Sequence, residues 1–322
     1  MSYSSEVYQK ARAFLEDNRR RAEHNAAVKK ADIYKHIPEL QDLEKSLFQT
    51  MARLSLTALE NGENSEKILN EIRNDNENLQ KNRKEYLLQN GYPEDALEPE
   101  YSCSICEDTG WIDGNRCSCY EEACRRFARE ELEKSSGAAK CSFDNFDLEL
   151  YPAEPEEHGL IPKNKMTANF RFCREYAQKF SLASPSLLLV GRTGLGKTHL
   201  SLSIAKEVLE KGYGVVYQTA QRLVNDLERA HFSPLGTDAD RKKYAECDLL
   251  IIDDLGAEFS NSFSVSAIGN LINERLFENR PTIISTNLTA GELTARYTER
   301  TGSRLLGEYK MLYFLGNDLR TR

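Results

Sequence analysis

The segment LLLVGRTGLGKT, residues 187–198, contains the residue types best suited to chemistry in this chain. Its apolar start predicts a strand, which leads into the pattern G-x-x-x-x-G-K-T and then into an amphipathic helix. Glycines let the backbone turn so that successive N–H groups face a phosphate chain, and the helix start adds a positive dipole end. The spacing therefore predicts a loop that binds ATP, consisting of Gly191, Arg192, Thr193, Gly194, Leu195, Gly196, Lys197 and Thr198.

Two side chains of this loop have distinct expected roles. The ammonium group of Lys197 is expected to reach the β- and γ-phosphates, and the hydroxyl of Thr198 is expected to ligate Mg²⁺. The alternative is a chance glycine-rich turn, which the agreement of strand, motif and helix disfavours.

The run DLLIIDDLG, residues 248–256, is an apolar strand that ends in two acids. ATP hydrolysis uses one carboxylate beside Mg²⁺ and a second to orient or deprotonate the attacking water. Asp253, interpreted as the first residue after the strand, is the predicted magnesium-side acid, and Asp254 is the predicted water-side acid. Glu258 is an alternative base nearby.

Further polar residues follow the acidic pair. Asn287 ends the predicted strand TIISTN, where it could contact the γ-phosphate or the attacking water. Arg300 and Arg304 lie four residues apart, so they share one helical face. This layout points to the AAA+ class of P-loop proteins, whose rings place an arginine here to reach the γ-phosphate of a neighbouring subunit. Arg304 is our first candidate for this arginine and Arg300 the second. The alternative is a surface arginine paired with an adjacent glutamate.

Four cysteines cluster in the segment CSICEDTGWIDGNRCSC, at positions Cys103, Cys106, Cys117 and Cys119. Four thiolates suit tetrahedral Zn²⁺, and a closed four-ligand site is structural rather than catalytic. The second pair is C-x-C rather than C-x-x-C, so Cys124 stays open as a substitute ligand. Scattered cytosolic thiols and an iron–sulfur cluster are the weaker alternatives.

Composition separates the 322 residues into four predicted regions. Residues 1–90 are polar with apolar positions at helical spacing, which predicts helices that form either a bundle or a partner-binding region. Residues 91–125 are the predicted zinc knuckle, 126–142 a linker helix with a weak point at Ser135-Ser136-Gly137, and 143–322 the AAA+ ATPase domain.

The ATPase region alternates strands with helices, which predicts an α/β fold with a parallel five-stranded sheet between helices. The predicted strands are 186–190, 214–218, 249–253, 282–285 and 311–315. The predicted helices are 197–211, 220–231, 263–279 and one or two within 289–308.

Charge and hydropathy exclude two classes of protein. The net charge of −8 argues against coating duplex DNA through bulk positive charge, although a local basic groove stays possible. No apolar run reaches the length of a membrane span, and the polar N-terminus does not resemble a signal peptide, so we expect a cytoplasmic protein without a membrane partner.

The motifs GRTGLGKTHL, LLIIDDLGAE, TIISTN and ERTGSRL, with CSFDNFDLELY before them, resemble the bacterial replicative helicase loaders of the DnaC/DnaI type. They are similar, nearly as closely, to the IstB-type transposase ATPases. The resemblance covers about residues 141–315.

The resemblance implies an ATPase that binds single-stranded DNA through the helix containing Gln221, Arg222 and Arg229. It also implies an N-terminal region that grips the replicative DNA helicase, and assembly as a homo-oligomer. The alternatives are a transposition helper ATPase and an ATP-dependent protein adaptor without DNA binding. The cysteine knuckle and the long helical N-terminus favour the loader.

Overall fold

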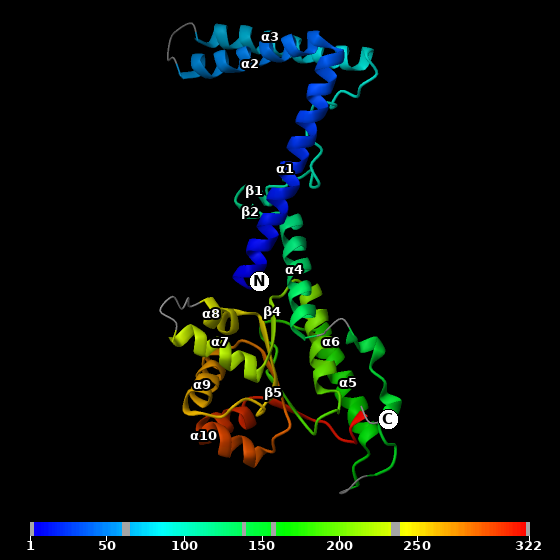
Figure 1. The fold of residues 1–322 in the computed structure, drawn as a ribbon, viewed down its shortest axis with the longest axis vertical. Coiled ribbons are helices and arrows are strands. Elements are labelled where there is room, and N and C mark those ends of the chain that lie inside the picture. Colours follow the sequence, from blue (N-terminus) through cyan, green and yellow to red (C-terminus); the bar gives the residue numbers. More distant parts are fainter. Residues whose placement is uncertain (1–2, 60–64, 137–139, 156–158, 233–238, 320–322) are drawn as a thin grey trace. The chain divides into compact units, whose positions relative to one another are not determined.

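The computed structural model of this chain describes residues 3–59, 65–136, 140–155, 159–232 and 239–319. The chain divides into two units, one formed by Met1–Arg12 with Ser118–Arg322 and the other by Ala13–Cys117. Figure 1 traces the elements of both units.

The larger unit is built on a five-stranded parallel sheet in the order β4-β5-β6-β3-β7. The three inner strands, β5, β6 and β3, are almost wholly buried because helices cover both faces of the sheet. Figure 1 shows α7 and α9 on one side and α5 and α6 on the other. The strands are β3 (Leu187–Val190), β4 (Val215–Thr219), β5 (Leu249–Leu255), β6 (Thr282–Thr286) and β7 (Lys310–Tyr313). The predicted α/β class with a parallel five-stranded sheet is confirmed.

The helices of this unit connect the strands. They are α4 (Ser118–Ser136), α5 (Pro162–Gln178), α6 (Lys197–Glu210), α7 (Ala220–Phe232), α8 (Ala239–Glu246), α9 (Ser262–Phe277) and α10 (Ala290–Gly307), with short 3₁₀ turns η2 (Phe143–Asn145) and η3 (Leu148–Leu150). Helix α8 was absent from the sequence prediction, because its segment ADRKKYAE is polar and has no apolar stripe. Non-helical dihedral angles at Tyr297 and Thr298 divide α10 in two.

Strand β5 differs from its prediction at the functionally important end. It continues to Leu255, so both acids lie within the strand, and the interpretation of Asp253 as the first residue after it is wrong. The pairing of β5 with β6 is irregular at this end. Its register shifts between Ile252 and Leu255, and Leu255 then pairs with Thr286. Such irregularities re-aim side chains at the rim of a sheet.

The smaller unit is helical, with the antiparallel pair α2 (Pro38–Leu59) and α3 (Ser65–Gln89) side by side in Figure 1. Helix α1 (Ser5–His36) contributes its first residues to the larger unit and the rest to this one. A small hairpin of β1 (Trp111–Ile112) and β2 (Asn115–Arg116) follows. The core beneath the helices consists of Ile33, Ile37, Leu40, Leu87, Ala96 and Leu97.

The domain boundaries predicted from composition remain predictions. Helix α4 begins at Ser118, inside the predicted knuckle, and ends at Ser136. Of the predicted weak point, Ser135 and Ser136 are the last two residues of α4, and Gly137 lies outside the described residues. No described helix combines the length and the apolar character that crossing a bilayer requires.

A fully buried arginine joins the ends of several elements in the larger unit. The guanidinium group of Arg275 donates to Thr282 Oγ1 at 2.8 Å, to the carbonyl oxygen of Pro281 at 2.7 Å and to that of Cys247 at 3.0 Å. Further hydrogen bonds go to the carbonyl oxygens of Tyr244 and Ala245 and to Cys247 Sγ. A buried charge needs such hydrogen-bond partners to offset its desolvation.

We expect Arg275→Ala to lower the free energy of unfolding by about 3 kcal/mol or more, because it leaves several buried carbonyl groups without a donor. Arg241→Ala is the control. It removes an exposed ion pair to Glu274 at 3.0 Å, which is expected to contribute about 1 kcal/mol or less. Urea denaturation of both variants measures the difference, and equal midpoints would contradict the expectation.

Candidate nucleotide-binding site

The glycine-rich loop lies between β3 and α6, as predicted. Gly194 and Gly196 have φ angles of 79° and 83°, which residues other than glycine rarely adopt. A Cβ atom on Gly196 would also lie 2.8 Å from the ring of Phe146 and from the hydroxyl of Tyr151. Glycine is therefore required here both for the turn and for the close approach of the preceding segment.

The side chain of Lys197 folds into this loop. Its residue is only 5% exposed, and its ammonium group donates to the carbonyl oxygens of Gly191 at 2.6 Å and Arg192 at 2.7 Å. The loop thus holds a buried positive charge at its centre, which is the arrangement that a phosphate-binding loop needs.

Asp253 is the buried acceptor on which three elements converge. Its carboxylate accepts hydrogen bonds from Thr198 Oγ1 at 2.9 Å, from the Tyr217 hydroxyl at 2.6 Å and from Ser285 Oγ at 2.5 Å. Burial, followed by the charge of Asp253, raises the pKa of Tyr217 above its usual value, so this phenol stays a donor. The sequence analysis assigned no role at this site to Ser285 or Tyr217, and both are buried against Asp253.

Asp254 faces the opposite way. Its φ of 54° is unusual for a residue with a side chain, and its backbone N–H donates to Ser285 Oγ at 2.9 Å. The residue is exposed and lines the cavity beside the loop. Thr198 and the two acids are therefore brought together, with one carboxylate pointing inward and the other into the cavity.

The cavity has a volume of about 440 Å³, within the range of small-molecule sites. One wall is the glycine-rich loop, and the other is the segment before the domain core. That wall contains Cys141, Asn145, Phe146, Asp147 and Leu150. Sequence reasoning used this segment only for the family resemblance. Its aromatic residues, placed before a P-loop, were the signal that could have identified it as part of the site.

Phe146 anchors the second wall. Its ring contacts the ring of His199 edge to face, with centroids 5.2 Å apart, and stacks on Tyr151 at 6.0 Å. His199 in turn bonds the carbonyl oxygen of Ser142 through Nε2 at 2.8 Å. The wall is thus fixed to the first turn of α6, directly beside the loop.

The remaining predicted residues lie outside this cavity. Asn287 is exposed and directly follows β6. Arg300 is exposed on α10, whereas Arg304 is half-buried and donates to Asn273 Oδ1. The side chain of Glu258, the alternative base, is only 1% exposed and pairs with Arg296 at 3.3 Å, so it is unavailable to an attacking water.

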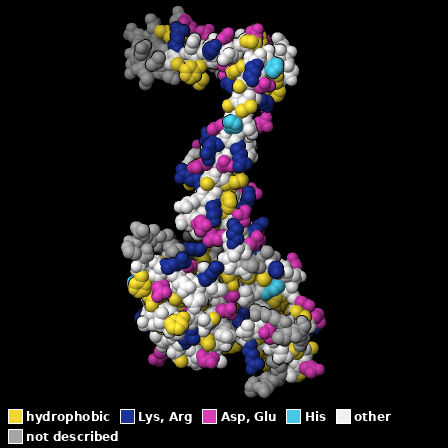
Figure 2. Space-filling model, viewed as in Figure 1, with side chains coloured by type: hydrophobic (Ala, Val, Ile, Leu, Met, Phe, Trp, Pro, Cys, Tyr) yellow, Lys and Arg dark blue, Asp and Glu magenta, His cyan; other side chains and the backbone are white. Residues whose placement is uncertain are grey.

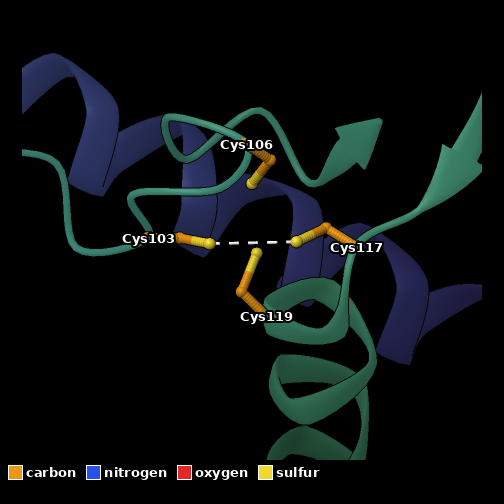
Figure 3. Close-up of side chains that lie close together, drawn as sticks. All are labelled: Cys103, Cys106, Cys117 and Cys119. Carbon is orange, nitrogen blue, oxygen red and sulfur yellow. Dashed lines mark hydrogen bonds between the residues drawn. The ribbon is translucent and has the colours of Figure 1, made fainter. Parts of the chain in front are cut away.

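The four predicted cysteines come together in Figure 3, with all four sulfur atoms within 4.8 Å of one another. Cys103 and Cys117 Sγ are 3.8 Å apart. Tetrahedral Zn–S bonds of about 2.3 Å would place sulfurs about 3.8 Å apart, so this donor set fits a zinc ion. Cys124 is buried on α4 and does not belong to the group.

Backbone contacts support the cysteine cluster. The carboxylate of Asp108, a buried residue, accepts from the N–H groups of Ser102 at 2.8 Å and Cys103 at 2.9 Å. The N–H of Gly110 donates to Cys106 Sγ at 3.3 Å. N–H donors to a ligand sulfur are typical of the shell around a thiolate site.

Comparison with known proteins agrees with this geometry. Residues 171–305 match the family described as IstB-like ATP binding protein. The replicative helicase loader DnaC of Escherichia coli strain K12 is 26% identical over 185 residues, which is 56% of this chain and 70% of DnaC. The chromosomal replication initiator protein DnaA of Wolinella succinogenes is 28% identical over 176 residues, 55% of this chain and 40% of DnaA.

A solved DnaC helicase loader has a TM-score of 0.47 with this chain at 21% identity, and the match covers 56% of this chain and 100% of the other. The sequence matches confirm the predicted resemblance to the DnaC-type loaders and the IstB-type ATPases, and with it the predicted ATPase activity.

We expect Lys197→Ala to reduce ATP turnover by about 100-fold or more, because a buried charge that would face the phosphates is lost. Lys211→Ala, at the exposed far end of α6, is the control and should retain turnover. Phosphate release from ATP measures both variants. Unchanged turnover in Lys197→Ala would contradict the role of the ammonium group.

Proposed function

We propose that this protein is an ATP-dependent helicase loader, which binds single-stranded DNA and holds or loads the replicative DNA helicase in the cytoplasm. The observation that supports this most directly is the similarity to the DnaC loader over 185 residues, joined to a nucleotide cavity whose two walls are fixed to each other. The unit Ala13–Cys117 lies outside the residues that match the ATPase family, which leaves it available to a partner.

Within the proposed site, each residue has a role that follows from its position. Lys197 would neutralise the phosphates, and Thr198 and Asp253 would hold Mg²⁺ through oxygen ligands. Mg²⁺ would supply charge neutralisation at the phosphate oxygens. Asp254, exposed in the cavity, would orient the attacking water.

Three residues outside the cavity complete the proposal. Asn287, at the end of β6, would contact the γ-phosphate or the water. Arg304, with Arg300 as the second candidate, would act on the nucleotide of a neighbouring subunit, which requires a homo-oligomer. Neither arginine lines the cavity of its own chain, which agrees with a role in trans.

The proposed DNA contacts differ from the predicted set, because two of the three predicted side chains already have partners. Gln221 already accepts from the N–H of Phe259 at 2.9 Å, and Arg229 pairs with Asp226 on the same helix. Arg222 is exposed on α7, and Phe232 at its end is 67% exposed. An arginine for phosphates and an aromatic ring for bases are the usual elements of single-strand binding. In the view of Figure 2 acidic and basic side chains are interspersed, so a local contact is favoured over a broad basic face.

The proposed helicase-binding surface is on α2. Phe48 and Met51 are 75% and 61% exposed, and their spacing places them on one face of the helix. Exposed apolar side chains that gather on one face are typical of protein interaction sites.

The loader proposal is tested with the purified full-length protein and the replicative helicase of its host. We expect a complex by size-exclusion chromatography with ATP, and we expect Phe48→Asp with Met51→Asp to abolish it. Leu182→Asp, an exposed apolar position in the ATPase unit, is the control and should retain the complex.

Other results in the same experiment would identify the alternatives. Capture of a transposase in place of the helicase would indicate an IstB-type transposition helper. Absence of both partners, together with no binding of a labelled oligothymidine in the presence of ATP, would indicate a protein adaptor.

We also propose that the cysteine cluster binds one structural Zn²⁺ per chain. We expect metal analysis to find about one zinc, and we expect Cys106→Ser to lower both zinc content and the melting temperature, because a metal stabilises a segment with little core. Cys124→Ser is the control and should retain the zinc. A folded, metal-free protein whose four thiols react freely would refute the site.

A further inference from the structure

The loop after the acidic pair, residues 256–259, connects the nucleotide site to two helices and to the next strand. The N–H of Gly256 donates to Glu258 Oε2 at 2.8 Å, and the N–H of Phe259 donates to Gln221 Oε1 on α7 at 2.9 Å. A Cβ atom on Gly256 would lie 2.6 Å from Leu288 Cδ1, next to Asn287. The loop is therefore fixed on several sides directly beyond Asp254.

Glu258 is the buried centre of this loop. Its Oε1 accepts from the hydroxyl of Tyr297 and forms an ion pair with Arg296 Nε at 3.3 Å. Arg296 Nη2 also donates to the carbonyl oxygen of Glu258 at 2.5 Å. Burial and the bond to Glu258 raise the pKa of Tyr297, which keeps its hydroxyl a donor.

These contacts reach α10 at the point where the helix is broken. Tyr297 has φ −108° and ψ 17°, and Thr298 has φ 75° and ψ 152°. Positive φ is strained for a β-branched residue, and such strain persists only where the surroundings hold it. Glu258 bonds the two residues that immediately precede Thr298, so it is placed to hold the break.

The second half of α10 contains both candidate arginines. Its start is packed tightly, because a Cβ atom on Gly302 would lie 2.7 Å from Thr294 Cα in the first half. Thr301 also approaches α9, where a Cβ atom on Gly269 would meet its hydroxyl at 2.9 Å. Because both arginines follow Thr298 on the same half-helix, a change in the backbone dihedral angles of Thr298 would move Arg300 and Arg304 together.

We propose that Glu258 is a positioning residue of the ATPase, which fixes the arginine-bearing half of α10 relative to the strand end containing Asp253 and Asp254. A shift of that strand end is transmitted through Gly256 and Glu258 to the break in α10. The proposal deepens the role in trans proposed above for Arg304, and it requires neither the helicase nor DNA.

The test uses steady-state ATP turnover and the affinity for a fluorescent, non-hydrolysable ATP analogue, with the full-length protein. We expect Glu258→Gln to reduce kcat by about 10-fold or more while nucleotide affinity stays within about 2-fold, because the side chain lies outside the cavity. Tyr297→Phe, which removes a single hydroxyl, should reduce kcat in the same direction. The double variant should have a kcat no lower than that of Glu258→Gln, since both substitutions break the same contact between Glu258 and Tyr297.

The control is Glu292→Gln, which removes a charge from an exposed position in the first turn of α10 and should retain turnover. Normal kcat in both Glu258→Gln and Tyr297→Phe would overturn the proposal. A parallel fall in kcat, nucleotide affinity and melting temperature would also overturn it, because that pattern indicates a merely structural residue. If Glu258→Gln does not fold, Tyr297→Phe decides by the same criteria.

The helicase complex is measured in parallel on the same preparations. If the wild-type protein binds no helicase but Glu258→Gln still lowers kcat selectively, the loader proposal fails and the positioning role stands. If the helicase complex forms and kcat is unaffected by both variants, the loader proposal stands and the positioning role fails.

Discussion

The buried carboxylate of Asp253 is the interaction on which the ATPase unit depends. A carboxylate out of contact with water requires hydrogen-bond donors, and here they come from the helix after the glycine-rich loop, from β4 and from β6. These donors are all neutral hydroxyls, so the charge itself is not balanced by a cation in this set of contacts. The divalent ion that we propose Thr198 and Asp253 would hold could supply that balance, and the same carboxylate would then serve both the fold and the nucleotide.

At the end of β5, Asp253 points inward and Asp254, the next residue, points into the cavity. A register shift in β5 turns Asp254 into the cavity and gives it a positive φ, and Ser285 bonds both the Asp253 carboxylate and the Asp254 N–H. Backbone strain next to a reactive side chain is a common feature of functional sites. A second strained position, Thr298, directly follows Tyr297, whose hydroxyl donates to Glu258, and Glu258 also accepts from the N–H of Gly256 just beyond the same strand end.

The cysteine cluster illustrates a different solution to stability. The hairpin of β1 and β2 is only a few residues long and has exposed strands, so it buries little apolar surface. Sulfur atoms brought within 4.8 Å of one another and N–H groups directed at Asp108 and Cys106 replace a hydrophobic core. A bound metal would then provide the cohesion that packing provides in the ATPase unit.

The sequence by itself determined the nucleotide loop, the acidic strand, the five parallel strands and the four clustered cysteines. These features are local, because each depends on residue types at fixed spacing along the chain. Only the tertiary structure decided that Ser285 and Tyr217 donate hydrogen bonds to Asp253. It also decided the cavity wall formed by Phe146 and the burial of Glu258 against Arg296. Those contacts join residues far apart in sequence, and the pairing of side chains across a fold leaves no periodic signal in a single chain. The kink in α10 belongs to the same class, because a distant buried carboxylate, not local propensity, holds it.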